Sequence, residues 1–255
     1  LQERFTNMLL AEGQYYVFGK DSSKQTLEQI YQVVEFIEFD LSKNEISLNH
    51  NDLKKLKAQP IDFFIHCAAI TDFRMLPEII EELSEVNFKG TKKILNFTYE
   101  LGVVRDFIYV GSAYSCGKNY GNIAADFYPE NDDFRNHYEK TKFLAEKYFV
   151  DFCKTKMLEY KVFRPSTLGG RTIEQPSGYT SKFDVFYSWC SFFVNLRRRA
   201  GIKLDDYSKV LEVPLRICAS QHSGLNIIAA DNAAKIMYRV IQSKHHNNNF
   251  HLANC

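Results

Sequence analysis

A tyrosine and a lysine suited to proton-donating chemistry lie four residues apart in the segment RNHYEKTKFLAEKYF, residues 135–149. On a helix, Tyr138 and Lys142 share one face, one turn apart. A phenol is a weak acid with a pKa of about 10, and a nearby ammonium group favours the phenolate and lowers that pKa. Such a pair can protonate the alkoxide that develops when a carbonyl is reduced. The same spacing also arises on a charged helix face, and Lys140 and Lys147 are neighbours here.

A hydroxyl group that can assist this pair ends an apolar run earlier in the chain. The run DFIYVGS, residues 106–112, closes with Ser112, whose hydroxyl can hydrogen-bond a substrate oxygen in a small oxyanion site. The alternative is an ordinary loop hydroxyl at a strand end. Ser112, Tyr138 and Lys142 are therefore the candidate catalytic residues.

Strand and helix patterns alternate along the chain. Helical patterns are clearest over residues 77–102 and 138–157. In the second, Phe143, Tyr148 and Phe152 are expected to face the sheet, while the Lys and Glu residues face solvent. Near-continuous apolar runs, typical of strands covered on both faces, span residues 14–19, 34–40, 62–68, 106–112 and 160–166. The alternation predicts an α/β fold, a Rossmann-like doubly wound parallel sheet.

The C-terminal third of the chain is less regular. A helix is expected from about 183 to 199, then a short apolar run, a helix N-capped by Asp231, and a last strand within 249–255. The aromatic residues of the first helix are predicted to form a core stripe, with an acyl-binding groove as the alternative; they are Phe183, Phe186, Tyr187, Phe192 and Phe193. We expect a dinucleotide-binding domain over residues 1–170 and a smaller substrate-binding lobe over 171–255 that partly returns to the core.

Composition excludes several classes of function. The net charge is only +1, so neither nucleic acid nor an anionic membrane is an expected partner, and no apolar run is long enough to cross a bilayer. Apolar residues make up 45% of the chain, enough for a sizeable core. The six cysteines are scattered without metal-ligand spacing, which predicts reduced thiols in a cytoplasmic protein and no metal site.

Small and polar residues follow the predicted strands, where open α/β sheets bind ligands. Five segments come in the order seen in extended short-chain dehydrogenases/reductases: IDFFIHCAAITDF, NFKGTKKIL, FIYVGSAYSCG, NHYEKTKFLAE and VFRPSTLGG. The chain resembles, more narrowly, the thioester reductase and fatty acyl-CoA reductase branch, on FDLSKNEISLNHNDLKKL, LNIIAADNAAKI and FHLAN. This resemblance covers nearly the whole chain.

The resemblance implies a set of residues around a dinucleotide. Asp40 corresponds to the residue that contacts the adenine amino group, although a helix cap is the alternative, and Asn87 to one that supports the site. Lys142 corresponds to the lysine that reaches the ribose hydroxyls, whereas His66 is expected to be a packed strand residue. The other implied cofactor contacts are Leu41, Cys67, Ala68, Ala69, Val110, Tyr138, Pro165, Ser166 and Thr167, and the substrate contacts are Ala113 and Tyr114.

The resemblance also bears on the choice of cofactor. Lys20 stands where the branch usually has Arg, which favours the 2′-phosphate of NADP, while the adjacent Asp21 leaves NAD open. The glycine-rich phosphate loop G-x-x-G-x-x-G is absent, and residues from Leu1 onward already read as a helix. We expect an N-terminal truncation that removes the first strand and this loop, with loss of ordinary cofactor binding as the alternative.

Together these residues predict an NADPH-dependent reductase of acyl thioesters carried by coenzyme A or a carrier protein, with an aldehyde or alcohol as product. Two alternatives remain. A nucleotide-sugar epimerase or dehydratase of the same class would use the same three residues, and a non-catalytic dinucleotide-binding protein would need no acid. A homodimer is expected only by analogy with the family.

Overall fold

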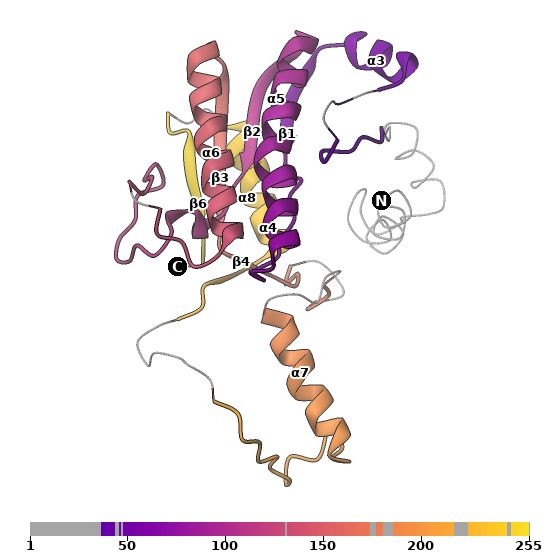
Figure 1. The fold of residues 1–255 in the computed structure, drawn as a ribbon, viewed down its shortest axis with the longest axis vertical. Helices are drawn as coiled ribbons and strands as arrows, with labels where there is room; N and C mark the ends of the chain where they lie inside the picture. Colours follow the sequence, from indigo (N-terminus) through magenta and orange to yellow (C-terminus); the bar gives the residue numbers. More distant parts are fainter. Residues whose placement is uncertain are drawn as a thin grey trace.

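Figure 1 shows the fold in a computed structural model of the chain. The structure describes residues 37–43, 46, 48–130, 132–173, 177–180, 186–216, 224–243 and 246–254. The strand predicted over residues 14–19 lies outside these ranges.

A parallel sheet forms the centre of the molecule. Its strands are β1 (Ile61–His66), β2 (Val104–Val110), β3 (Glu159–Pro165) and β6 (Asn249–Leu252), in the order β1-β2-β3-β6. A smaller parallel pair joins β4 (Thr167–Gly169) to β5 (Ile227–Ala229). Because the strands are parallel, the residues after β1, β2 and β3 emerge at one edge of the sheet.

Helices cover both faces of this sheet (Figure 1). On one face lie α4 (Pro77–Leu83), the π-helical turn η1 (Ser84–Lys89), α5 (Gly90–Leu101) and α6 (His137–Lys156). On the other lies α8 (Ala230–Gln242). Successive strand residues point to opposite faces of the sheet and pack into two hydrophobic cores. Phe107 and Tyr109 pack under α5 and α6, whereas Ile108 packs with α8. The predicted fold class is confirmed.

The remaining elements are short, apart from α7. They are the helix α3 (His50–Lys57), the 3-10 turn η2 (Ala113–Cys116) that follows β2, and α7 (Phe186–Arg199). Helix α7 lies apart from the sheet in Figure 1. Phe192 and Phe193 on it are exposed, so the predicted core stripe is wrong for them, while Phe183 falls outside the described residues. Among the described helices, none is long and apolar enough to cross a membrane.

Capping residues fix the ends of the two main helices. The side chain of Asn136 accepts a hydrogen bond from the Glu139 amide and starts α6, which places Tyr138 in its first turn. Gly102, with φ of 70°, ends α5 in the left-handed conformation that glycine adopts without strain. The segment predicted as one helix over 77–102 is helical throughout, but η1 interrupts its α-helical hydrogen bonding. Such π turns are frequent at functional sites.

Two local predictions are wrong. Residues 37–40 of the predicted strand 34–40 are not in a strand, because among the described residues none pairs with them and the chain turns at Leu41 and Ser42. Asp231 is not the N-cap of α8, which is Ala229. Its carboxylate instead accepts hydrogen bonds from the backbone amides of Thr172 and Ile173, at 3.1 and 2.8 Å, and so fixes the chain after β4.

Candidate active site

The three candidate catalytic residues come from two elements that meet at the carboxyl edge of the sheet. Ser112 lies two residues after the end of β2, and Tyr138 and Lys142 lie one turn apart near the start of α6. Lys142 ties the two elements together, since its Nζ donates a 2.8 Å hydrogen bond to the carbonyl oxygen of Val110. Val110, predicted as a cofactor contact, thus also holds the lysine.

Lys142 is buried, and its ammonium group lies 4.7 Å from the centre of the Tyr109 ring. Burial lowers the pKa of Lys142 to about 8, while the charge of Glu146 and the thiol of Cys67 act in the opposite direction. The lysine is therefore not the solvated surface charge that the spacing of Lys140 and Lys147 would suggest. It is charged near neutral pH and loses its proton in the mildly alkaline range.

Tyr138 is half-buried and lies beside the loop that follows β1. The ring of Phe73 packs edge-on against its ring, with 5.3 Å between the centroids. One side of the phenol is thereby fixed by an apolar neighbour. The helix start presents the phenol on the same side of α6 as Lys142.

Ser112 is buried in extended backbone at the start of η2. Its Oγ accepts a 3.2 Å hydrogen bond from the Tyr114 amide, which leaves the hydroxyl proton available to a substrate oxygen. The two predicted substrate contacts, Ala113 and Tyr114, follow it in η2. Tyr114 also shares a 2.8 Å hydrogen bond with the hydroxyl of Thr167, so the segments after β2 and β3 meet.

Asn87 joins the loop after β1 to the helix of the tyrosine and lysine. Its amide brackets Ile70, accepting from the backbone nitrogen at 2.8 Å and donating to the carbonyl oxygen at 3.0 Å. It also donates to Oγ1 of Thr141, the residue before Lys142, at 3.3 Å. The π turn brings Asn87 to this buried position. His66, as expected, is a packed strand residue; burial lowers its pKa to about 3, and its ring bonds the Thr91 hydroxyl.

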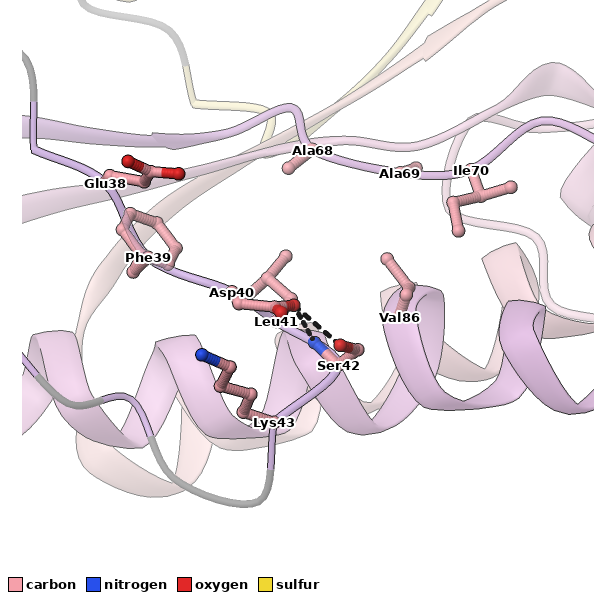
Figure 2. Close-up of a pocket in the computed structure, with 10 residues that line it drawn as sticks. All are labelled: Glu38, Phe39, Asp40, Leu41, Ser42, Lys43, Ala68, Ala69, Ile70 and Val86. Atoms are coloured by element: carbon pink, nitrogen blue, oxygen red, sulfur yellow. Dashed lines mark hydrogen bonds between the residues drawn. The ribbon is translucent and has the colours of Figure 1, made fainter. Parts of the chain in front are cut away.

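A cavity of about 720 Å³ lies beyond the end of β1 (Figure 2). Figure 2 shows the chain at residues 38–43 facing the chain at 68–70, with Val86 of η1 below Ala69 and Ile70 in this view. The predicted adenine contact Asp40 lines it, together with three other predicted cofactor contacts, Leu41, Ala68 and Ala69. Cys67 is exposed just before them. Lys20 falls outside the described residues.

Asp40 is held by a local turn rather than by a helix. Its Oδ1 accepts from the amide of Ser42 at 2.9 Å and from the hydroxyl at 2.6 Å, and these bonds lower the pKa of the carboxyl group. Its other carboxylate oxygen can accept from an amino group in the cavity. Gly90 allows this turn to approach α5, because a Cβ there would lie 3.0 Å from Cβ of Leu41.

The residues after β3 complete the edge. Pro165 ends β3, and the amide of Ser166 donates a 2.8 Å hydrogen bond to the carbonyl oxygen of Leu252 in β6. The Ser166 hydroxyl is buried and has no hydrogen-bond partner among the described residues, which fits a ligand that brings a polar group such as a carboxamide to this point. Every predicted site residue within the described ranges thus lies at or near one edge of the sheet.

One buried group beside this edge is not among the residues predicted from the sequence. Glu146, one turn after Lys142, is wholly buried and forms an ion pair with Arg164 of β3. The mixture of Glu and Lys in this helix predicts that Glu146 is part of a solvated face, and the structure shows that this prediction is wrong for it. The signal that could have found it is its position four residues after Lys142, on the side of α6 that faces the sheet.

Comparison with known proteins identifies the family and the fold of the chain. Residues 3–237 match an NAD-binding family described as Male sterility protein. No curated protein matches the chain. Among solved structures, the terminal R domain from the myxalamid PKS-NRPS biosynthetic pathway has a TM-score of 0.67 and 17% identity, over 91% of this chain and 54% of that one.

Two further structures are similar. RMD from Pseudomonas aeruginosa complexed with NADPH has a TM-score of 0.56 and 18% identity, over 88% of this chain and 73% of that one. A thiolation-reductase di-domain from an archaeal non-ribosomal peptide synthetase has a TM-score of 0.52 and 19% identity, over 77% of this chain and 49% of that one. At these identities the likeness shows a shared Rossmann-like fold, and the chain spans about half the length of both reductase structures.

Proposed function

Because the chain belongs to the male sterility protein family of NAD-binding proteins, within the extended short-chain dehydrogenases/reductases, we propose that it is an NADPH-dependent reductase of acyl thioesters. The thioester is carried by coenzyme A or a carrier protein, and the product is an aldehyde, which a second reduction converts to an alcohol. The observation that carries this proposal is the buried Lys142 ammonium, bonded to the strand end beside Ser112 and one turn from Tyr138. The similar thiolation-reductase di-domain supports a carrier-bound substrate.

The dinucleotide fits the edge of the sheet in two places. Asp40 offers a carboxylate oxygen in the cavity lined by Leu41 and Ala69, and Ser166 offers a buried hydroxyl that no described residue hydrogen-bonds. The small side chains allow a flat ring to lie close to the backbone after β1. When bound, the cofactor supplies the hydride. The lysine at position 20 favours the NADP form.

Residues of the chain stabilise the negative charge that develops on the thioester oxygen and supply the proton that neutralises it. As the thioester carbonyl carbon becomes tetrahedral, Ser112 donates a hydrogen bond to its oxygen and Tyr138 donates a proton to it. Lys142 supplies the positive charge that favours the phenolate left on Tyr138. The resulting hemithioacetal breaks its carbon–sulfur bond; the sulfur leaves as a thiol after taking the hydroxyl proton, and the aldehyde remains.

The proposal is tested by NADPH consumption in the full-length protein, with acyl-CoA and acyl carrier protein substrates of several chain lengths. Tyr138→Phe should lower turnover by about a hundredfold, because the proton donor is lost while the ring stays packed on Phe73. Tyr120→Phe is the matched control, since Tyr120 is 93% exposed. A loss of less than about tenfold in Tyr138→Phe contradicts the assignment. Copurified NAD without NADPH consumption would instead favour an epimerase or dehydratase.

A further inference from the structure

A fully buried ion pair lies directly behind the candidate catalytic residues. Glu146 of α6 is 0% exposed and Arg164 of β3 is 1% exposed. The guanidinium group binds Oε1 of Glu146 through Nε at 2.8 Å and through Nη2 at 2.7 Å, and Nη2 also donates to the carbonyl oxygen of Phe127 at 2.8 Å. Such a pair adds little stability over apolar residues of the same size, because both ions lose their hydration. Its presence points to a role other than stability.

The second carboxylate oxygen of Glu146 faces the strand end that carries Ser112. The hydroxyl of Ser115 lies 3.5 Å from this Oε2 and donates a 2.7 Å hydrogen bond to the carbonyl oxygen of Ser112. Gly111 is in contact with the same oxygen, since a Cβ built on it would lie only 2.5 Å from Oε2. The glycine therefore allows the carboxylate to reach the backbone just before Ser112.

Glu146 also faces Lys142, one turn earlier on the same helix. Burial lowers the pKa of Lys142, and the negative charge of Glu146 is the largest influence that raises it. The other groups that face the lysine cannot replace this charge. His66 on β1 is neutral because its pKa lies near 3, Tyr109 on β2 is kept in its phenol form by burial, and Cys67 contributes less than Glu146.

We propose that Glu146 and Arg164 are a positioning pair, which fixes Ser112 relative to Lys142 and keeps Lys142 charged for catalysis. Arg164 holds the carboxylate from β3, the carboxylate supports the end of β2 through Ser115 and Gly111, and the same carboxylate faces the lysine on α6. One buried group thus connects the elements that carry the three candidate catalytic residues. The role of the pair in catalysis rests on the proposed function. The effect of Glu146 on the charge of Lys142 can be measured without a substrate.

The test is the titration of the Lys142 side chain by NMR in the full-length protein labelled at lysine nitrogen, with the signal assigned by its loss in Lys142→Met. The variants are Glu146→Gln and the charge-free double variant Glu146→Gln/Arg164→Met. The double variant avoids an unpaired buried guanidinium, so it folds even where the single variant does not. Glu139→Gln is the matched control, because Glu139 is also buried on α6 but pairs with Arg135.

The pair predicts a Lys142 titration midpoint near pH 8 in the unchanged protein and in Glu139→Gln, and a lower midpoint in both Glu146 variants. The alkaline limb of the turnover profile should move down in pH with it. An unchanged midpoint in the folded double variant overturns the proposal. Failure of both Glu146 variants to fold also overturns it, because the pair would then be purely structural. A lowered midpoint in a protein that reduces no thioester would refute the proposed function and leave the coupling between Glu146 and Lys142 in place.

Discussion

Helices α6 and α7 are both rich in aromatic residues, yet they place them in opposite environments. On α6, Phe149 is wholly buried between the sheet and α5, and even the charged residues Lys142 and Glu146 lie inside the protein. On α7, Trp189 is 54% exposed, and Phe192 and Phe193 are exposed with it. Two helices that are both rich in aromatic residues therefore differ in burial: α6 packs into the interior together with charged side chains, whereas α7 exposes its aromatic side chains to solvent.

The difference shows where function is to be sought. Burying an ionised side chain costs free energy, so buried charges that persist at a strand edge mark a site with a chemical task. An exposed aromatic surface keeps apolar area in water, which is also unfavourable, but such a surface indicates a contact with another molecule rather than chemistry. We therefore place the chemistry at α6 and treat α7 as part of the surface.

The largest expected effect tests the packing of α6 against the sheet. Phe149→Ala should lower the free energy of unfolding by about 3–5 kcal/mol, because it leaves a cavity among Tyr109, Ala145 and Tyr160. Chemical denaturation measured by circular dichroism gives this value. A loss below about 1 kcal/mol would mean that α6 does not pack on the sheet as described.

The next effect concerns Asn87 of η1, whose side chain holds the loop after β1 to α6. Asn87→Ala should cost about 1–3 kcal/mol of stability, because the backbone polar groups of Ile70 are left without their partner. Turnover should fall as well, since Thr141 and the start of α6 lose a tether to the loop after β1. Asn119→Ala is the comparison, because the Asn119 side chain bonds the Cys116 carbonyl oxygen and no other group in the described part of the chain. Equal losses of turnover in the two variants would contradict the role of Asn87 in joining the loop after β1 to α6.

The pH dependence should have opposite signs for stability and activity. The pKa of Lys142 falls from 10.5 to about 8 on folding, so between these values the unfolded chain binds more protons and stability rises with pH. Over the same range turnover should fall, because the ammonium group is lost. Denaturation and rate profiles from pH 7 to 10.5 check both. If Lys142→Met leaves the slope of stability against pH unchanged over this window, the lysine is not the group responsible.

The smallest expected effect tests the exposure of the aromatic side chains on α7. Trp189→Ala should change the free energy of unfolding by no more than about 0.5 kcal/mol, because the side chain is largely in solvent. The same denaturation measurement applies. A loss comparable to that of Phe149→Ala would show that α7 is packed in the folded protein.

Much of the fold follows from short-range patterns. The apolar runs that became β2 and β3 are near-continuous because helices cover both faces, and this is visible in sequence. The run that became β1 has the same pattern, although its Ile65 is 48% exposed. The site residues at the ends of these strands follow from the same reasoning, since parallel strands end at one edge. The spacing of Tyr138 and Lys142 indicates the helix face that they share.

The errors have long-range causes. Glu146 resembles a solvated residue until the partner that neutralises it, Arg164, is brought beside it by β3. Residues 37–40 resemble a strand, but strand formation needs a neighbour that local sequence does not reveal. The aromatic residues of α7 resemble a core stripe because periodicity alone cannot distinguish a buried face from an exposed one.

The most direct test of the account is the binding of NADPH and NADH to the full-length protein, followed by nicotinamide fluorescence. We predict saturable binding that is tighter for NADPH and is abolished by Ala68→Trp, which fills the cavity that Asp40 and Leu41 line. Lys57→Trp, on the exposed end of α3, is the control and should bind normally. Absence of binding by either nucleotide would contradict the claim that this edge of the sheet is a dinucleotide site.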